Sequence, residues 1–103
     1  MNALLLLLLL AGCGSARTGS CDHAGATCAE YDGEHANLIV LKEFCDGTFT
    51  WGGTCDRSGD VVGECLRNGD SVMTVTVYYA PDFDPDSAET DCTEVQVGAF
   101  TPG

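Results

Sequence analysis

Residues 61–79 read VVGECLRNGDSVMTVTVYY, and this stretch predicts a β-hairpin around which the rest of the fold is organised. Asn68-Gly69 is typical of a two-residue turn of type I′, in which both central residues take positive φ. The stretch after the turn, residues 71–79, is rich in β-branched and aromatic side chains, which favour strands. We therefore expect two antiparallel strands joined at Asn68-Gly69.

The predicted register places Arg67 opposite Asp70, as a favourable cross-strand charge pair. The same register gathers large apolar side chains on one face of the hairpin. These side chains are Met73, Val75, Val77 and Tyr79 from one strand, with Leu66 and Val62 from the other. Glu64 would fall on this apolar face as well, and Cys65 on the opposite one. The sequence therefore leaves two alternatives: both faces of the sheet are partly covered, or a bulge near Gly63 resets the alternation.

A helix is predicted over residues 34–44, after a short strand at residues 28–31 and an Asp-Gly turn. Apolar side chains at three- and four-residue spacing would form the buried stripe of this helix. These side chains are Leu38, Leu41 and either Phe44 or Cys45. The next stretch, residues 51–54, reads WGGT and predicts a tight hairpin between strands at residues 48–51 and 54–56.

A second helix is predicted to begin near Asp84-Pro85 or Asp86, with an aspartate as its N-terminal cap. The order of a tyrosine, a cysteine and a Gly-x-Phe-Thr segment also occurs twice in the chain. The two copies are Tyr31, Cys45 and residues 47–50, and Tyr79, Cys92 and residues 98–101. This order predicts two related strand–helix–strand halves. The fold class that follows is α+β: a small disulfide-stapled domain with an antiparallel sheet of four to five strands and two short helices.

The chain has seven cysteines, which is an odd number. Six of them are expected to form three disulfides, because small exported domains are commonly braced in this way. These six are Cys21, Cys28, Cys45, Cys55, Cys65 and Cys92. Six cysteines allow fifteen pairings, among which we favour Cys45 with Cys55, across a helix end and the adjacent hairpin. A zinc site is disfavoured by the lack of a C-x2-C pair, since Cys21-Asp-His23 with Cys28 is only a partial site.

The N-terminus reads MNALLLLLLLAGCG and predicts a signal peptide over residues 1–12. The apolar run from Ala3 to Ala11 would be about 13 Å long as a helix, whereas the apolar core of a bilayer is about 30 Å thick. The run is therefore too short to span a membrane. An apolar segment of this length that ends in small residues is typical of a secretory signal.

Leu10-Ala11-Gly12-Cys13 resembles the lipobox of bacterial lipoproteins. The resemblance implies that the Cys13 thiol receives a diacylglyceryl group, that the signal is then removed, and that the new amino terminus is acylated. It thus implies a small Cys-rich protein of the bacterial cell envelope, anchored by lipid, and Gly14 in place of aspartate implies the outer membrane. We expect residues 13–20 to be a flexible tether and residues 21–103 to be the folded domain.

The chain is strongly acidic, with 16 Asp and Glu against 4 Lys and Arg and a net charge of −12. Nucleic-acid partners are excluded, because their recognition needs a basic surface. The acidity should also keep the folded body away from anionic lipid headgroups. Asp82, Asp84 and Asp86 have the alternate spacing of calcium loops, and calcium is the one cofactor that the sequence suggests. Helix capping and solvation account for the same three residues.

No catalytic motif is apparent, and we expect that the protein is not an enzyme. A G-x-S-x-G motif is missing, and His23 and His35 are expected at the surface. Trp51 and Tyr78 are the candidates for a surface that binds an envelope protein or a glycan, although Trp51 packed against the sheet is the alternative. The predicted function is a lipid-anchored, non-enzymatic binding or structural module of the envelope. The alternatives are a calcium-binding module or accessory to a secreted hydrolase, which would use the three aspartates, and an enzyme with no recognisable motif.

Overall fold

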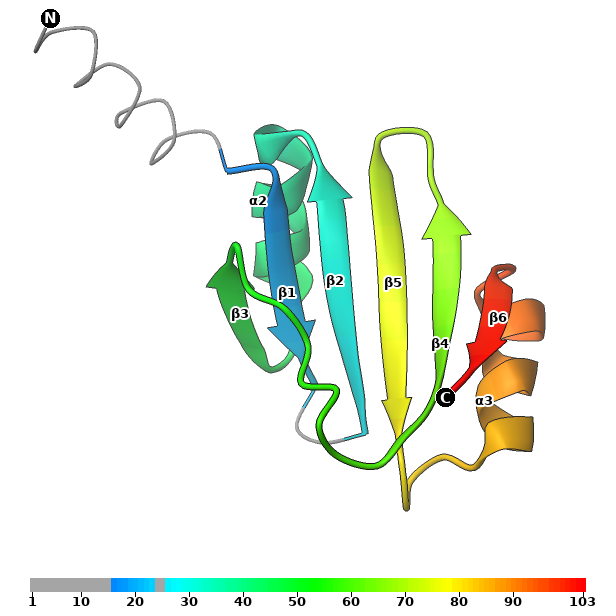
Figure 1. Cartoon of the computed structure of the whole chain (residues 1–103). Helices are drawn as coiled ribbons and strands as arrows, with labels where there is room; N and C mark the ends of the chain where they lie inside the picture. Colours follow the sequence, from blue (N-terminus) through cyan, green and yellow to red (C-terminus); the bar gives the residue numbers. More distant parts are fainter. Residues whose placement is uncertain (1–15, 24–25) are drawn as a thin grey trace, which may run out of the picture.

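The computed structural model describes residues 16–23 and 26–103. These residues form a six-stranded antiparallel sheet with two short helices (Figure 1). The predicted signal peptide, residues 1–12, and the predicted lipidation site, Cys13, lie outside the described residues. Within the described part of the chain, no helix is long and apolar enough to cross a membrane.

The sheet has the strand order β3-β1-β2-β5-β4-β6. Its strands are β1 (Thr18–Asp22), β2 (Thr27–Gly33), β3 (Thr48–Trp51), β4 (Val61–Asn68), β5 (Val72–Tyr79) and β6 (Ala99–Pro102). The helices are α2 (His35–Phe44) and α3 (Pro85–Thr90), and a π-helical turn, η1 (Asp91–Val95), extends α3. The prediction of four to five strands is therefore too low.

Strand β1 is the strand that the sequence pattern does not indicate. Its residues, TGSCD, include no large apolar side chain, so they lack the alternation that marks a half-buried strand. Residues 18–20 belong to the predicted tether, and yet Ser20 and Cys21 are buried between two neighbouring strands. The folded part thus begins at Thr18 and not at Cys21.

The same arrangement of elements occurs in each half of the sheet. The hairpin β1–β2 is followed by α2 and by β3, which pairs with β1; the hairpin β4–β5 is followed by α3 and by β6, which pairs with β4. Strands β2 and β5 pair at the centre. Equivalent positions in the two registers include Gly19 and Gly63, Cys21 and Cys65, Tyr31 and Tyr78, and Phe49 and Phe100. Each half therefore has one strand more than predicted, and Tyr78 rather than Tyr79 corresponds to Tyr31.

A glycine lies beneath a phenylalanine ring in both halves. A Cβ atom on Gly19 would lie 2.5 Å from the ring of Phe49, and one on Gly63 would lie 2.3 Å from the ring of Phe100. Real Cβ atoms do not approach other heavy atoms this closely. The rings of the two edge strands thus pack directly on the backbone of their neighbours.

Both faces of the sheet are covered. Helices α2 and α3 lie on one face, where Leu38, Tyr78 and Ala88 are fully buried (Figure 1). The connection from β3 to β4, residues 52–60, crosses the opposite face, and we call it the strap. Cys28, Cys55 and Val77 are buried together between the strap and the sheet. The register of β4 with β5 also shifts between Val61 and Gly63, so the sheet has the predicted bulge as well as two covered faces.

The hairpin β4–β5 forms as predicted, but its turn lies two residues later. The Gly69 amide donates a hydrogen bond to the carbonyl oxygen of Val72 at 3.0 Å, which centres the turn on Asp70-Ser71. The predicted pair of Arg67 with Asp70 is therefore wrong. A Cβ atom at position 69 would lie 2.7 Å from the Val72 oxygen. Glycine is therefore needed at position 69 because two backbone segments approach closely there, and not because the residue takes a positive φ.

All six cysteines of the described domain are paired. The disulfides are Cys21–Cys45, Cys28–Cys55 and Cys65–Cys92. The favoured pair of Cys45 with Cys55 is wrong, and so is the hairpin between residues 48–51 and 54–56. Strand β3 pairs with β1, and the chain then crosses the sheet, which brings Cys55 to β2.

Helix α2 begins at His35, one residue after the predicted start, and Leu38 is its one fully buried side chain. Cys45, which follows the helix, is joined to β1 by its disulfide. Phe44 is 80 % exposed. Of the two alternatives for the end of the buried stripe, Cys45 is therefore the one that faces the sheet.

Candidate functional site

The two aromatic residues predicted to form a binding surface pack within the fold. Tyr78 is fully buried, which corrects the prediction that it lies on the surface, and its hydroxyl donates to Asp91 at 2.7 Å. Burial, together with the Asp91 carboxylate, raises the pKa of Tyr78, so the hydroxyl keeps its proton at neutral pH. Trp51 stacks on His35 with ring centroids 4.7 Å apart and packs edge to face with Phe49 at 5.0 Å.

The three aspartates predicted as calcium ligands do not converge. Within the described part of the chain, their carboxylates form no group close enough to share an ion. Asp84 is the N-terminal cap of α3, because its carboxylate accepts a hydrogen bond from the Ser87 amide at 2.8 Å. This hydrogen bond lowers the pKa of Asp84. Helix capping, with Pro85 as the first helical residue, therefore accounts for Asp84.

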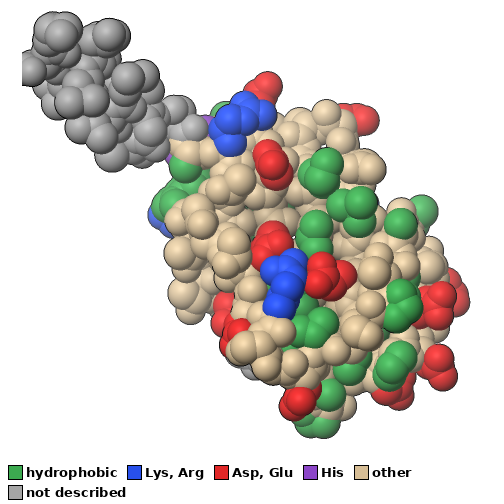
Figure 2. Space-filling view, in the orientation of Figure 1, with side chains coloured by type: hydrophobic (Ala, Val, Ile, Leu, Met, Phe, Trp, Pro, Cys, Tyr) green, Lys and Arg blue, Asp and Glu red, His purple; other side chains and the backbone are tan. Residues whose placement is uncertain are grey.

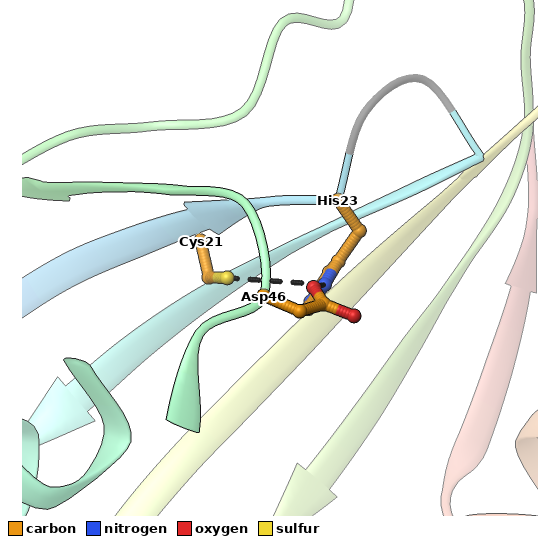
Figure 3. Close-up of side chains that lie close together, drawn as sticks. All are labelled: Cys21, His23 and Asp46. Atoms are coloured by element: carbon orange, nitrogen blue, oxygen red, sulfur yellow. Dashed lines mark hydrogen bonds and ion pairs between the residues drawn. The ribbon is translucent and has the colours of Figure 1, made fainter. Parts of the chain in front are cut away.

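One other cluster has ligating atoms close together: Cys21, His23 and Asp46, within 4.8 Å of one another (Figure 3). The sulfur of Cys21 is bonded to Cys45, whereas a cysteine ligand must be a thiolate. His23 Nδ1 is hydrogen-bonded to the Asp46 carboxylate, and this contact lowers the pKa of Asp46. The cluster is therefore a polar pair beside a disulfide and not a metal centre.

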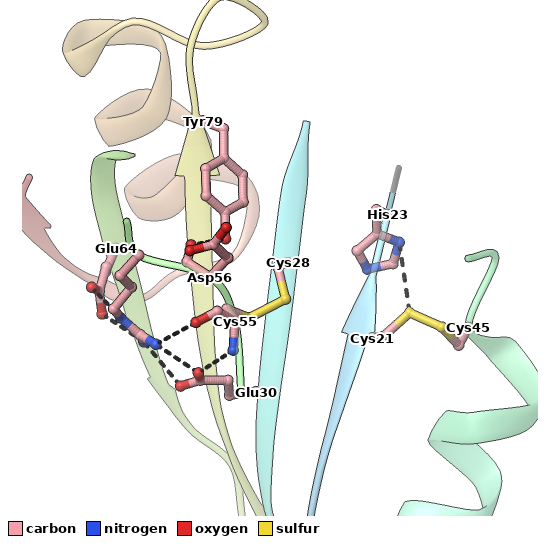
Figure 4. Close-up of a disulfide and its surroundings, with 10 residues drawn as sticks. Cys21, His23, Cys28, Glu30, Cys45, Cys55, Asp56, Glu64 and Tyr79 are labelled. Atoms are coloured by element: carbon pink, nitrogen blue, oxygen red, sulfur yellow. Dashed lines mark hydrogen bonds and ion pairs between the residues drawn. A yellow bond between two sulfur atoms is a disulfide. The ribbon is translucent and has the colours of Figure 1, made fainter. Parts of the chain in front are cut away.

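The strap is fastened to the sheet by a disulfide and by a network of charged groups (Figure 4). Cys55 of the strap is bonded to Cys28 of β2, and its amide donates to the Glu30 carboxylate at 2.6 Å. Arg57 forms ion pairs with Glu30 at 2.7 Å and with Glu64 at 2.9 Å. Because Glu30 lies on β2 and Glu64 on β4, one arginine bridges two strands across the central β5.

The network stabilises the charged forms of Glu30 and Arg57. The hydrogen bond from Arg57 is the main cause that lowers the pKa of Glu30, and Glu30 and Glu64 together raise the pKa of Arg57. Both oxygens of the Glu30 carboxylate accept hydrogen bonds from the strap. The Tyr79 hydroxyl adds a hydrogen bond to the carbonyl oxygen of Asp56 at 2.6 Å. Glu30 is thus ionised at neutral pH, and each of its carboxylate oxygens already accepts a hydrogen bond from the strap.

Beside this network, the strap and the sheet enclose a hollow of about 280 Å³. Met73 and Val75 of β5 provide its apolar surface, and Glu30 and Asp32 of β2 provide carboxylates. Residues 52–54 of the strap close one side. Figure 2 views this face and shows hydrophobic side chains gathered next to acidic and basic ones. The size is close to the lower limit of about 300 Å³ for small-molecule sites, so the hollow suits one side chain or a compact ligand.

The sequence alone does not single out the residues around the hollow. Glu30 and Asp32 are two of 16 acidic residues, and Met73 appears only as part of an apolar strand face. Arg57 is one of four basic residues, and this scarcity is the one signal that could have drawn attention to it. The residues come together through the pairing of β2 with β5 and through the Cys28–Cys55 disulfide, neither of which is predictable from spacing.

No family model, curated protein or solved structure matches this chain, so no relative supplies a function for the hollow or the strap.

Proposed function

We propose that this chain is a lipid-anchored, non-enzymatic binding module of the bacterial cell envelope, held at the outer membrane by lipid on Cys13. The observation that carries the binding part is the hollow on the strap face. Its walls are fixed in advance by the Cys28–Cys55 disulfide and by the ion pairs of Arg57. Preformed hollows with an apolar lining and a few placed polar groups are the usual form of ligand sites.

The chemistry of the hollow favours a basic side chain presented by another envelope protein. Met73 and Val75 offer apolar surface to the methylene stem of a lysine or arginine. Asp32 is exposed beside them and offers a carboxylate to the charged end. The net charge of −12 would also attract a basic partner from a distance.

The hydrogen bonds that the Glu30 carboxylate accepts favour a binding role over catalysis. A general base needs a carboxylate oxygen that can reach the reacting proton. Both oxygens of Glu30 are occupied by Arg57 and by the Cys55 amide. Glu30 therefore acts as a structural anchor of the strap, and Asp32 is left as the carboxylate for recognition.

The proposed anchor is supported by the arrangement of the cysteines. All six cysteines of the described domain are paired, as is common in oxidising compartments outside the cytoplasm. Cys13 is the seventh cysteine, and lipidation gives it a separate role. Since β1 begins at Thr18, the chain between Cys13 and the sheet can reach at most about 17 Å. The folded body would therefore lie close to the membrane, nearer than its acidity alone would place it.

We also propose that the two halves derive from one repeated unit. The disulfide from the first strand of the hairpin to the end of the helical segment occurs in both halves and supports this origin. Among residues 61–103, which make up the second half as the structure describes it, there is no counterpart of the Cys28–Cys55 disulfide or of the strap. The hollow thus belongs to the features that the halves do not share.

The anchor is tested by mass spectrometry of the mature chain purified from a diderm bacterium. We expect a chain that begins at Cys13, carries acyl mass there and has no free thiol. An unmodified Cys13 would contradict the proposed lipid anchor. Free thiols in the domain would contradict its location in an oxidising compartment outside the cytoplasm.

The binding surface is tested by nuclear magnetic resonance with a label on methionine methyl groups. The chain has two methionines, Met1 and Met73, so the mature protein would give a single methyl signal, inside the hollow. We expect this signal to shift on titration with a short Lys-Leu peptide and not with its norleucine counterpart. Asp32→Asn should abolish the shift, whereas Asp82→Asn, a charge-matched control away from the hollow, should leave it unchanged. A Met73 signal that ignores both peptides would contradict the proposed ligand class.

A further inference from the structure

Helix α2 is apolar on its outer side as well as on its buried side. Leu38 is its one fully buried residue, while Ile39 is 44 % exposed, Val40 52 % and Phe44 80 %. The helix also carries the exposed residues Lys42 and Glu43, but apolar side chains that gather on an exposed surface mark a site of interaction. We call Ile39, Val40 and Phe44 the outer face of α2. All three side chains are exposed in the described part of the chain, and Val40 also borders a hollow between α2 and the β4–β5 hairpin.

The equivalent helical segment of the second half is mainly acidic, and Val95 is its one strongly exposed large apolar side chain. Helix α3 and the turn η1 carry the acidic residues Asp86, Glu89, Asp91 and Glu94. The chain has no Lys or Arg after Arg67, so neither α3 nor η1 carries a basic residue to offset these charges. Helix α2 carries one Lys and one Glu, Lys42 and Glu43, which are adjacent and cancel. The two halves therefore present very different surfaces from the same place in the fold.

The chain enters the domain directly beside α2. His35, the first residue of α2, is hydrogen-bonded through Nδ1 to the carbonyl oxygen of Ala16 at 3.0 Å. Ala16 is three residues after Cys13, a span of at most about 11 Å. A helix with its side chains is about 10–12 Å across. A lipid on Cys13 would therefore bring the lipid headgroups within one helix diameter of α2.

We infer that the outer face of α2 lies in the headgroup region of the membrane that holds Cys13. This inference rests on the proposed lipid anchor, and it makes the membrane lipid itself the partner of the exposed apolar side chains. Apolar helix faces of this kind bind at the boundary of headgroups and acyl chains. Repulsion between anionic headgroups and the acidic α3 would turn the second half away from the surface. Because the strap lies on the sheet face opposite α2, its hollow would point away from the membrane, open to a partner.

Hydrogen–deuterium exchange of the mature lipid-carrying chain tests this orientation. The chain is reconstituted in phosphatidylethanolamine vesicles that contain a minor share of phosphatidylglycerol. We expect the α2 amides to exchange severalfold more slowly in the wild type than in Val40→Ser/Phe44→Ser. Both substituted residues are exposed, so the fold should persist, and denaturant unfolding of each variant checks this. Val95→Ser is the matched control, because Val95 is 73 % exposed on η1, and it should exchange like the wild type.

The outcomes separate this inference from the anchor on which it rests. After a lipase removes the ester-linked acyl chains, the α2 amides of the wild type and the double variant should exchange at the same rate. A difference that persists would mean that the substitutions act on the helix itself, and it would overturn the inference. Acyl mass on Cys13 with equal α2 exchange in vesicles would overturn the inference and leave the anchor standing. A Cys13 without acyl mass would remove the anchor and the inference together.

Discussion

Removal of the Cys28–Cys55 disulfide should loosen the strap selectively. The two cysteines are 27 residues apart, and closing a loop of this length contributes about 3.5 kcal/mol at 25 °C through the entropy of the unfolded chain. Cys28→Ala/Cys55→Ala should therefore lower the free energy of unfolding by about that amount and the Tm by roughly 15–25 °C. Cys65–Cys92 has the same separation, so Cys65→Ala/Cys92→Ala is a control of equal entropic cost.

Urea unfolding measures the loss of stability, and hydrogen–deuterium exchange locates it. Both double variants should be destabilised to a similar extent, but faster exchange across residues 52–60 is expected for Cys28→Ala/Cys55→Ala alone. Part of the strap should remain held, because Arg57 still pairs with Glu30 and Glu64. Equal strap exchange in the two double variants, or a loss below about 1 kcal/mol in the first, would refute this account of the strap.

Three further changes test the packing, the backbone and the charge network. Gly63→Ala should lower the free energy of unfolding in urea by about 1–3 kcal/mol, because the new Cβ would clash with the ring of Phe100. The control is Gly59→Ala, whose Cβ would have no atom within 4 Å, and it should change the free energy of unfolding by less than about 0.5 kcal/mol. Val97 has a φ of 55°, so Val97→Gly should raise the free energy of unfolding by about 1 kcal/mol, and an unchanged urea midpoint would argue against strain at this residue. The folded-state pKa of Glu30 lies below its unfolded value of about 4.3, so the stability it gains from Arg57 is present above that pH and is lost as the pH falls through the folded pKa. Urea unfolding between about pH 5 and pH 2 should thus show a weaker pH dependence in Glu30→Gln than in the wild type.

The central hairpin was predictable because its two strands carry strong β-propensity and an alternation broken at one glycine. Glu64 stays on the face that the alternation predicts, where it pairs with Arg57 of the strap. The bulge instead places Val62 on the opposite face, against the cluster around Tyr78. The turn was not predictable from Asn68-Gly69. The structure shifts the turn by two residues, which preserves the face on which each side chain lies, so the apolar pattern fits both registers equally well. Local turn preference alone then favoured the wrong register.

Strand β1 shows a second limit of the sequence pattern. Its burial comes from its two neighbours, β2 and β3, and from the Cys21–Cys45 disulfide, not from large apolar side chains of its own. The cysteine pairing has the same origin. Cys45 and Cys55 are close in sequence but are drawn to β1 and β2 on opposite faces of the sheet. The spacing of the cysteines along the sequence does not indicate which face of the sheet a connecting segment crosses.

The repeated halves offer a physical way to separate scaffold from site. Some features occur in both halves: a glycine under a phenylalanine ring, and a disulfide from a strand to the end of a helix. The need to close one three-stranded unit explains these shared features. Features found in one half alone have no such explanation. They are the strap with its own disulfide, the hollow it forms with β2 and β5, and the apolar outer face of α2. Exposed apolar side chains and an ion-pair network of partly exposed charged groups contribute little to the stability of a small domain. The two features lie on opposite faces of the sheet, and both are near the entry of the chain, because Thr18 lines the hollow and Ala16 contacts α2. If the proposed lipid anchor holds, the apolar face of α2 can rest on the membrane while the opposite face stays open to a partner.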